Sequence, residues 1–177
     1  PYRVTLVAVF LLTVIFDLTV AVEFGILAAC VVFIYRISSL SRGERLTAAE
    51  QPALAGHDNR LQAWRLYGAL FFGATKLVEA LEDDLPSTVL VLDLKNVIYV
   101  DSTGAEALDN LLQTCRRQGV RLIVSGLMAQ PLDIARRTGL LERLQAQSPQ
   151  DVQPDVAHAV AVAVAGLMPA PEPAGDE

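Results

Sequence analysis

The chain has 177 residues, of which 20 are acidic and 14 basic, and its formal net charge at pH 7 is −6. A protein that binds nucleic acid needs a basic surface to neutralise phosphates, so this composition excludes that class of partner. The apolar fraction, 53%, and the mean hydropathy of +0.39 are high for a soluble protein. The acidic excess belongs to the part from His57 onward, because the residues before it hold four acidic and four basic side chains.

Apolar residues dominate the first segment of the chain. Between Val4 and Tyr35 the only charged side chains are Asp17 and Glu23. One straight helix over this stretch would be about 48 Å long, whereas the hydrocarbon layer of a membrane is about 30 Å thick. We therefore expect a hairpin of two shorter helices, at about 4–16 and 20–36, joined by a turn around Asp17.

Each of these helices is near or below the length of about 20 residues that spans a membrane. Short helices persist in a membrane when they pack against more protein, so further membrane helices are expected upstream. A secretory signal peptide does not fit, because the apolar segment is too long and no clear cleavage site precedes Tyr35. Asp17 and Glu23 either mark an ion pathway or cap the turn and face water or other helices, and their place at the expected break favours the second interpretation.

Arginines flank the apolar hairpin. Arg3 lies at its start, and Arg36, Arg42 and Arg45 follow its end. The positive-inside rule places both ends in the cytoplasm. The sequence therefore predicts a multi-pass protein of the cell inner membrane whose acidic C-terminal part is cytoplasmic.

A polar segment separates the hairpin from a region with the composition of a compact domain. Segment 37–59 has no sustained apolar period and predicts a linker with one helical turn. The domain is expected over 60–168, with a turn at Gly68 and a disordered tail at 169–177. The expected strands are 61–67, 69–72, 88–94 and 120–125, and the expected helices are 76–84, 103–118, 131–138 and 155–167. Alternation of strands and helices predicts an α/β fold with a mostly parallel sheet.

One motif in this domain carries chemistry. Asp101, Ser102, Thr103 and Gly104 lie between a buried strand and the clearest helix of the chain. Their oxygens suit capping of free backbone N–H groups at a helix start, and Gly104 permits close backbone approach. The same helix start suits a phosphorylated hydroxyl or a bound anion. Capping is the interpretation that these residues favour on their own.

Other reactive residues form no recognisable site. Cys30 and Cys115 lie far apart and belong to no CxxC pair, so both thiols are expected to pack as small apolar groups. His57 and His158 are equally isolated, which argues against a metal site. No nucleophile and base occur in a catalytic arrangement, and no glycine-rich phosphate loop is present, so neither an enzyme nor a cofactor is expected.

Several stretches resemble one known family, in its order. Its central signature is matched by Val89–Leu94, Val97, Asp101–Ala105 and Leu108, and further matches are Gly119–Ile123, Ser125–Leu127 and Thr138–Leu140. Tyr67–Phe72 is similar to the start of the same domain in membrane transporters, and Thr13, Asp17–Thr19, Ala21, Val22 and Gly25 are similar to the last two membrane helices of those transporters. The chain thus resembles the C-terminal part of a SulP-type (SLC26-like) anion transporter, in which a STAS domain follows the membrane helices.

The resemblance implies a four- or five-stranded sheet backed by helices. It also implies a regulatory module associated with a homodimeric transporter, and the transporter's substrate site would lie in helices outside this chain. In stand-alone STAS proteins, the anti-sigma-factor antagonists, a partner kinase phosphorylates the first hydroxyl of the Asp-Ser-Thr-Gly loop, which corresponds to Ser102 here. In transporters that modification is less established.

Two functions remain open from the sequence. The first is the cytoplasmic regulatory end of a secondary transporter for sulfate, bicarbonate or a dicarboxylate, with the lipid membrane, upstream helices and a regulatory protein as partners. The second is a membrane-tethered or soluble signalling module that phosphorylation switches. The apolar hairpin favours the first, because a soluble antagonist has no use for it.

Overall fold

The structure is a computed structural model that describes residues 2–15, 18–38, 41–57, 59–71 and 74–167. The chain divides into two compact units, residues 1–39 and 40–177, and each is described by itself. The predicted turn at Asp17 and the predicted tail at 169–177 lie outside the described residues.

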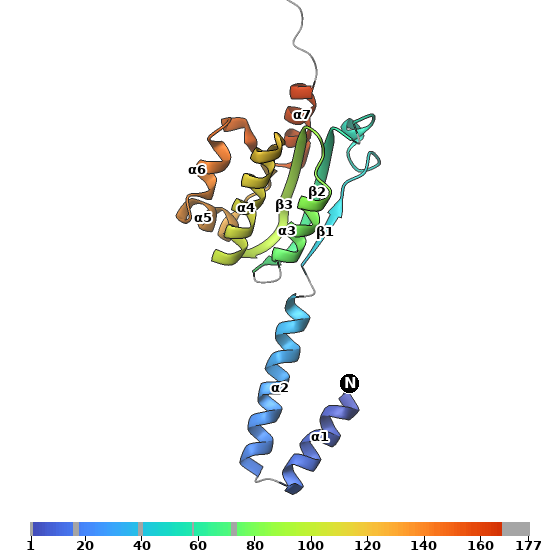
Figure 1. Ribbon diagram of the computed structural model, residues 1–177, viewed down its shortest axis with the longest axis vertical. Helices are drawn as coiled ribbons and strands as arrows, with labels where there is room; N and C mark the ends of the chain where they lie inside the picture. Colours follow the sequence, from blue (N-terminus) through green and yellow to red (C-terminus); the bar gives the residue numbers. More distant parts are fainter. Residues whose placement is uncertain (1, 16–17, 39–40, 58, 72–73, 168–177) are drawn as a thin grey trace, which may run out of the picture. The chain divides into compact units, whose positions relative to one another are not determined.

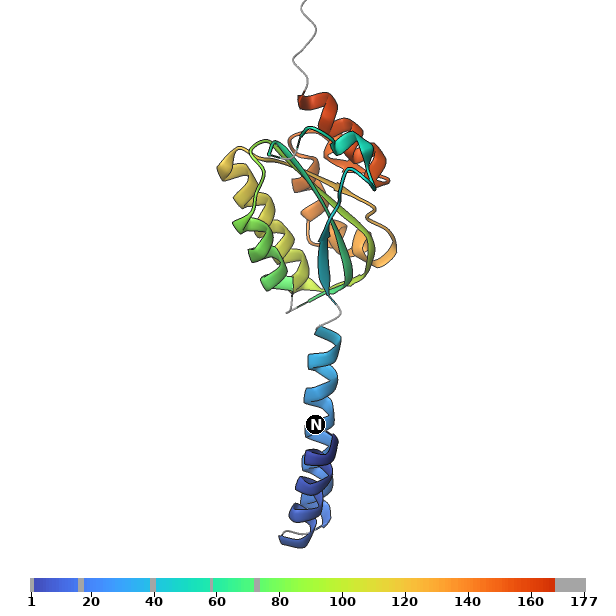
Figure 2. The ribbon, with the colours of Figure 1, turned by 90° about the vertical axis from the view of Figure 1, so that its right-hand side faces the viewer.

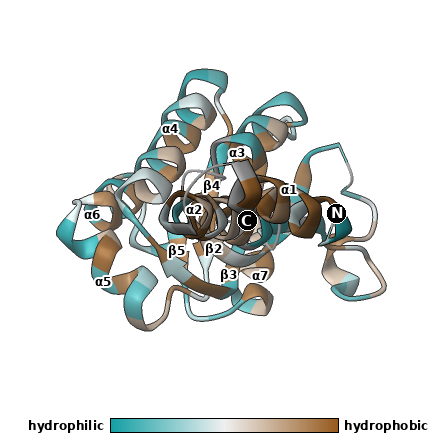
Figure 3. Cartoon of the chain, turned by 90° about the horizontal axis from the view of Figure 1, so that it is seen from below, coloured by the Kyte–Doolittle hydropathy of each residue, from teal (hydrophilic) through white to brown (hydrophobic). Residues whose placement is uncertain are grey.

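Two helices form the first unit, α1 (Tyr2–Ile15) and α2 (Leu18–Ser38). Exposed large apolar side chains occur along both helices. In Figure 3, α1 is brown, the hydrophobic colour, whereas α4 of the second unit carries both brown and the hydrophilic teal. Within α2, Thr19–Arg36 is long and apolar enough to cross a membrane by length and composition, whereas the apolar part of α1 is shorter. Glu23, one of the two acidic residues noted in the sequence, is exposed in the second turn of α2.

A five-stranded sheet with helices forms the second unit (Figure 1). Its strands run in the order β1-β2-β3-β4-β5; β1 is antiparallel to β2, and the other neighbours are parallel. The elements are β1 (Arg42–Arg45), η1 (Pro52–Leu54), β2 (Leu61–Leu70), α3 (Ala74–Asp83), β3 (Val89–Val100), α4 (Ser102–Gln118), β4 (Arg121–Ser125), α5 (Ala129–Arg137), α6 (Leu140–Gln145), η2 (Pro149–Asp151), β5 (Val152–Gln153) and α7 (Val156–Leu167). The mostly parallel α/β sheet that the sequence predicted is confirmed.

Helices cover both faces of this sheet because its central strand is apolar on both. Leu90, Leu92 and Leu94 of β3 pack in the core cluster shared with α3, α4, α5 and α6. Val89 and Val91, on the opposite face, pack in a second cluster against α7. Figure 2 shows α3 and α4 side by side on one side of the strands and α7 on the other.

Two predictions about strands were wrong. Residues 61–70 form the single strand β2, where the sequence predicted two strands and a turn. Gly68 has the positive φ of 88° expected for a turn, but the strand continues through it. The register shifts here, since Gly68 pairs with Val97 and Ala69 with Tyr99, so the extra residue, Ile98, lies on β3. Likewise β3 continues to Val100, beyond the predicted end at Leu94.

The predicted linker also contains part of the sheet. Helix α2 continues to Ser38, and β1 then pairs with Trp64–Tyr67 of β2. The short sequence Arg-Gly-Glu-Arg has no apolar period, so its strand state depends on backbone hydrogen bonds to β2. Leu46 and Leu54, which follow β1, are buried in the cluster beneath α7. Strand β5 and helix α6 were not predicted, since two and six residues are too short to establish a period.

A polar row crosses the sheet at one level of all five strands. Arg65, Asp93 and Ser125 are in register, with Glu44 on β1 and Gln153 on β5 completing the row. Asp93 is 0% exposed, and its carboxylate accepts from Arg65 Nε at 2.7 Å and from Lys95 N at 3.1 Å. The hydrogen bond to Asp93 is the main reason that the pKa of Arg65 is raised. Asp93 is therefore a buried charge of the sheet that is paired with Arg65.

Replacing Asp93→Asn should leave Arg65 without its buried partner at nearly unchanged side-chain volume. We expect the free energy of unfolding to fall by about 2–4 kcal/mol, because the guanidinium of Arg65 then loses its buried partner and keeps only the exposed carboxylate of Glu50, at 3.6 Å. Urea unfolding of the whole chain in detergent, followed by the fluorescence of Trp64, measures this. Asp133→Asn, which removes an exposed pair with Arg137, is the matched control and should change stability by no more than about 0.5 kcal/mol. Equal effects of the two variants would contradict the role given to Asp93.

Candidate functional site

The predicted site, Asp101–Gly104, lies where β2 and β3 both end. Asp101 N donates to Leu70 O at 3.1 Å, which joins the loop to the end of β2. From α5, Gln130 binds both backbone groups of Val100: its Oε1 accepts from Val100 N at 2.8 Å, and its Nε2 donates to Val100 O at 2.7 Å. Three elements therefore fix the point at which the chain passes from strand to helix.

Asp101 is the N-cap of α4. Its backbone is extended, with φ −96° and ψ −174°, and its Oδ1 accepts from Gly104 N at 2.7 Å. Its carbonyl oxygen accepts the first helical hydrogen bond, from Ala105 N at 2.9 Å. The carboxylate also lies at the positive end of the helix dipole. The capping interpretation of Asp101 agrees with this geometry.

Gly104 is required by close packing of α4 on β2. A Cβ at this position would overlap Leu70 O and would lie 2.7 Å from the Leu70 carbonyl carbon. These are backbone atoms of β2, an interior strand of the sheet, and they cannot move aside as a flexible side chain can. The first turn of α4 is therefore held against the end of β2 by the absence of a side chain.

Ser102 and Thr103 occupy the same turn and remain exposed. Within the described part of the chain, neither hydroxyl has a hydrogen-bond partner in the structure. Thr103 borders a groove of about 330 Å³ between α3 and α4, lined also by Val78, Glu79, Glu82, Glu106, Ala107 and Asn110. The three glutamates oppose binding of a free anion there, and Asp101 already occupies the place that an anion takes at a helix start. Accessible hydroxyls at a rigid turn suit covalent modification better.

Gln130 helps to hold the Asp101–Gly104 loop in place, and the sequence did not predict this role. It acts on backbone atoms of Val100, so no partner side chain signals its role. Its position follows Ala129, which adopts a positive φ of 48°, a conformation that is uncommon for a residue with a Cβ. Nothing in the residues around Ala129 predicts that conformation.

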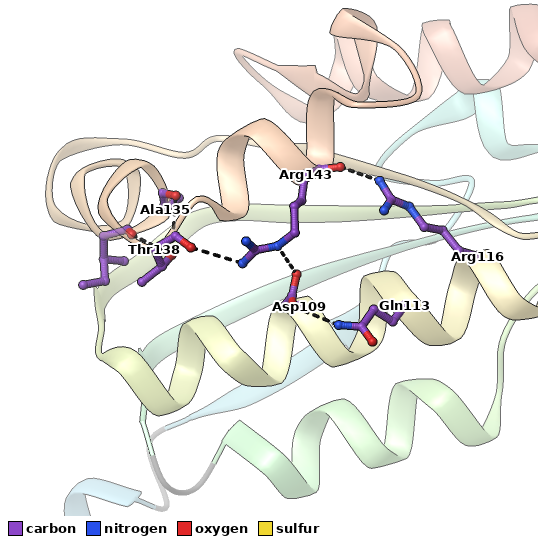
Figure 4. Close-up of polar contacts among 7 residues, drawn as sticks. Asp109, Gln113, Arg116, Ala135, Thr138 and Arg143 are labelled. Atoms are coloured by element: carbon purple, nitrogen blue, oxygen red, sulfur yellow. Dashed lines mark hydrogen bonds and ion pairs between the residues drawn. The ribbon is translucent and has the colours of Figure 1, made fainter.

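The far side of α4 is fixed by arginine side chains from two helices (Figure 4). Arg143 of α6 donates from Nε to Asp109 Oδ1 at 2.6 Å and from its NH2 group to Thr138 O at 3.2 Å. Arg116 of α4 donates in return to Arg143 O, and Gln113 Nε2 donates to Asp109 Oδ2 at 3.0 Å. Helix α4 is thus held in its middle and C-terminal turns, in addition to the contacts of its first turn with β2.

The remaining reactive groups stay outside this site. Cys115 is 0% exposed, and burial raises the pKa of its thiol to about 12, which leaves it protonated and unreactive. His158 Nδ1 lies 2.8 Å from Asp155 Oδ2 at the start of α7, and the backbone N–H of His158 lowers the pKa of Asp155. Among the described residues, no three His, Cys, Asp or Glu side chains are grouped as metal ligands.

Replacing Gly104→Ala should destabilise the domain by about 2–3 kcal/mol, because the added methyl group overlaps backbone that cannot relax. Gly166→Ala is the matched control: it also lies in a helix, and its Cβ would be 3.4 Å from the flexible end of Arg121. That variant should gain about 0.5–1 kcal/mol from the helix propensity of alanine. Unfolding of both variants in urea measures the difference, and a neutral Gly104→Ala would contradict the close packing of α4 on β2.

Asp101→Ala should cost about 1 kcal/mol of unfolding free energy through loss of the N-cap. Ser102→Ala should stay within about 0.5 kcal/mol, since the exposed hydroxyl makes no contact that holds the fold. The same unfolding measurement tests both. If Ser102→Ala were as costly as Asp101→Ala, the hydroxyl would be a structural group and not a free one.

Comparison with known proteins identifies the second unit. The STAS domain family model matches residues 52–159. YvdB of Bacillus subtilis (strain 168), a candidate sulfate transporter by name, is 33% identical over 150 residues, or 80% of this chain and 27% of that protein. The bicarbonate transporter BicA of Picosynechococcus sp. (strain ATCC 27264 / PCC 7002 / PR-6) is 27% identical over 148 residues, or 77% of this chain and 26% of that protein.

A solved structure agrees on the fold. The inward-facing murine anion transporter Solute Carrier 26 family member A9 superposes with a TM-score of 0.68 and 20% identity, over 91% of this chain and 28% of that one. The chain spans about a quarter of the length of the curated relatives it matches. It belongs to the STAS domain family and is homologous to the SulP-type sulfate and bicarbonate transporters.

Proposed function

We propose that the chain is the C-terminal part of a SulP-type secondary anion transporter: its last membrane helices, α1 and α2, followed by a cytoplasmic STAS domain that regulates transport. The observation that carries the proposal is the joining of an exposed apolar helix to a STAS domain in one chain. The fold shared with Solute Carrier 26 family member A9 covers 91% of the chain, which is more than the second unit alone comprises.

The exposed surface of α2 supports a membrane location. Large apolar side chains such as Phe24, Val32 and Phe33 are more than half exposed. In water such a surface would associate with other surfaces, whereas hydrocarbon suits it. Helix α1 has 14 residues and a length of about 21 Å, too short to cross the membrane without support. We expect α1 to pack against helices of the parent protein.

Charge sets the expected orientation. Arg36 lies in the last turn of α2, and Arg42 and Arg45 follow within ten residues. By the positive-inside rule this end of α2 faces the cytoplasm, in a multi-pass protein of the cell inner membrane. The carried anion is expected to be sulfate, bicarbonate or a dicarboxylate, and the transporter is expected to act as a homodimer. The proposal includes no catalytic activity for this chain.

The first turn of α4 is the expected regulatory element. Asp101 and Gly104 hold this turn in place, while Ser102 and Thr103 are exposed beside the acidic groove between α3 and α4. A phosphate on Ser102 would add about two negative charges beside Glu79, Glu82 and Glu106 without breaking the cap. Such a change alters the surface that a partner protein meets and leaves the fold intact. A signalling module without transport is the alternative function that the same loop would serve.

The test is anion uptake by the full-length parent protein in proteoliposomes, beside a version that ends at Ser38. Truncation at Ser38 removes β1, which belongs to the sheet, and keeps all of α2. Sulfate, bicarbonate and fumarate form the panel. We expect uptake of one anion, at a rate that changes on truncation, because the membrane helices carry the anion and the STAS domain adjusts its passage.

Ser102→Asp and Ser102→Ala in the full-length protein separate regulation from simple loss of a domain. We expect uptake to differ between these two variants, since only the aspartate adds charge at an unchanged fold. Uptake of none of the three anions by correctly folded protein would overturn transport in favour of the signalling alternative. Equal uptake by both variants and the parent would remove the regulatory role from Ser102 and leave the turn its structural role.

A further inference from the structure

Exposed large apolar side chains in the second unit gather at one end of its sheet. Among the described residues between 41 and 167 they are Ile98, Tyr99 and Met128, with exposed fractions of 76%, 49% and 61%. We call these three residues the Ile98–Met128 patch. Every other large apolar side chain described in that unit is at least partly covered.

The fold brings the three residues together. Ile98 and Tyr99 precede Val100, and Gln130, which binds both backbone groups of Val100, lies two residues after Met128. Ile98 and Tyr99 are exposed because the cluster beneath α7 reaches along β3 only as far as Val91. Beyond Asp93 the described residues of the α7 cluster include none from β3, while Val97 and Val100 remain buried on the α4 side.

The chain joins the sheet at the same end. Ser41 Oγ donates to Ala69 O, and Ala69 is the register partner of Tyr99. Tyr99 is therefore two strands away from Ser41, or about 10 Å. Only three peptide steps separate Ser41 from Ser38, the last residue of α2, and these span at most about 10 Å.

We propose that the Ile98–Met128 patch docks on the lipid headgroup region of the membrane that α2 crosses. The inference rests on the proposed function, because α2 must leave the bilayer near Ser38 for the distances to apply. The patch then lies within about 20 Å of the point where the chain leaves the bilayer. Its chemistry fits an interface: a tyrosine ring suits the headgroup level, and an isoleucine and a methionine suit shallow insertion.

The tether explains why so small a patch is sufficient. Three side chains bury too little area to hold a free protein on a membrane. A domain that α2 already anchors meets the surface at high effective concentration, so a weak contact becomes populated. Charge contributes little to this contact. Lys95 is a single exposed cation near the patch, and the charge of Arg42 is offset by Glu44 at 3.2 Å. The contact therefore depends on apolar groups and should persist at high salt.

Spin labels on the full-length protein test the contact. Nitroxides are attached at Ile98→Cys and Met128→Cys in a Cys30→Ser background, with the protein in vesicles of phosphatidylcholine and phosphatidylglycerol. The native Cys115 does not label, since it is buried and its pKa is raised to about 12. Gln147→Cys is the control: Gln147 is also exposed but lies beside Gly119 and Val120, at the opposite end of the parallel strands.

We expect lipids that carry chelated nickel to relax the labels at 98 and 128 severalfold more than the label at 147. Water-soluble nickel should relax 98 and 128 severalfold less. Equal relaxation at all three positions would overturn the proposal. Shielding of 98 and 128 from both nickel reagents would also overturn it, since protein and not lipid would then cover the patch. The native protein labelled at Cys30 is the reference: a label there that is reached by water-soluble nickel would place α2 outside the bilayer and defeat the proposed function itself.

Discussion

The second unit depends on one constraint, which is that the central strand β3 must be buried on both faces. All six residues from Val89 to Leu94 are at most 3% exposed. A strand of this kind folds only where elements on both sides exclude water from it. Helices α3–α6 satisfy one face and α7 satisfies the other. Helix α7 is thus as necessary to the sheet as the helices that follow its strands directly.

Asp93 marks the level at which this two-sided burial stops. On the α7 face of β3 the apolar residues end at Val91. The next residue on that face is Asp93, whose carboxylate is paired with Arg65. Beyond it β3 is buried on one side alone, so Ile98 and Tyr99 become exposed while Val97 and Val100 stay in the core. The polar row therefore separates the packed half of the sheet from the half that is free for contacts.

The first turn of α4 contains two residues that hold the fold and two that are exposed. Asp101 caps the helix and Gly104 lets the turn approach β2, so both are occupied in holding the fold. Ser102 and Thr103, between them, are exposed. A modification there can change the surface without changing the core. This separation suits a loop that signals, because a switch that weakened its own domain could not be read reliably.

Local patterns in the sequence determined much of this protein. The apolar front segment predicted two helices, the β-branched run at 88–94 predicted a buried strand, and the period after Thr103 with Gly119 beyond it predicted α4. Asp101 and Gly104 also showed their capping chemistry, since these features lie within a few residues of one another. The tertiary structure alone decided β1, the continuation of β2 through Gly68 opposite a bulge in β3, the bonds of Gln130 to Val100, and the exposure of Ile98, Tyr99 and Met128. Each of these depends on backbone partners or cover supplied by distant parts of the chain, and a short segment carries no record of what will lie beside it.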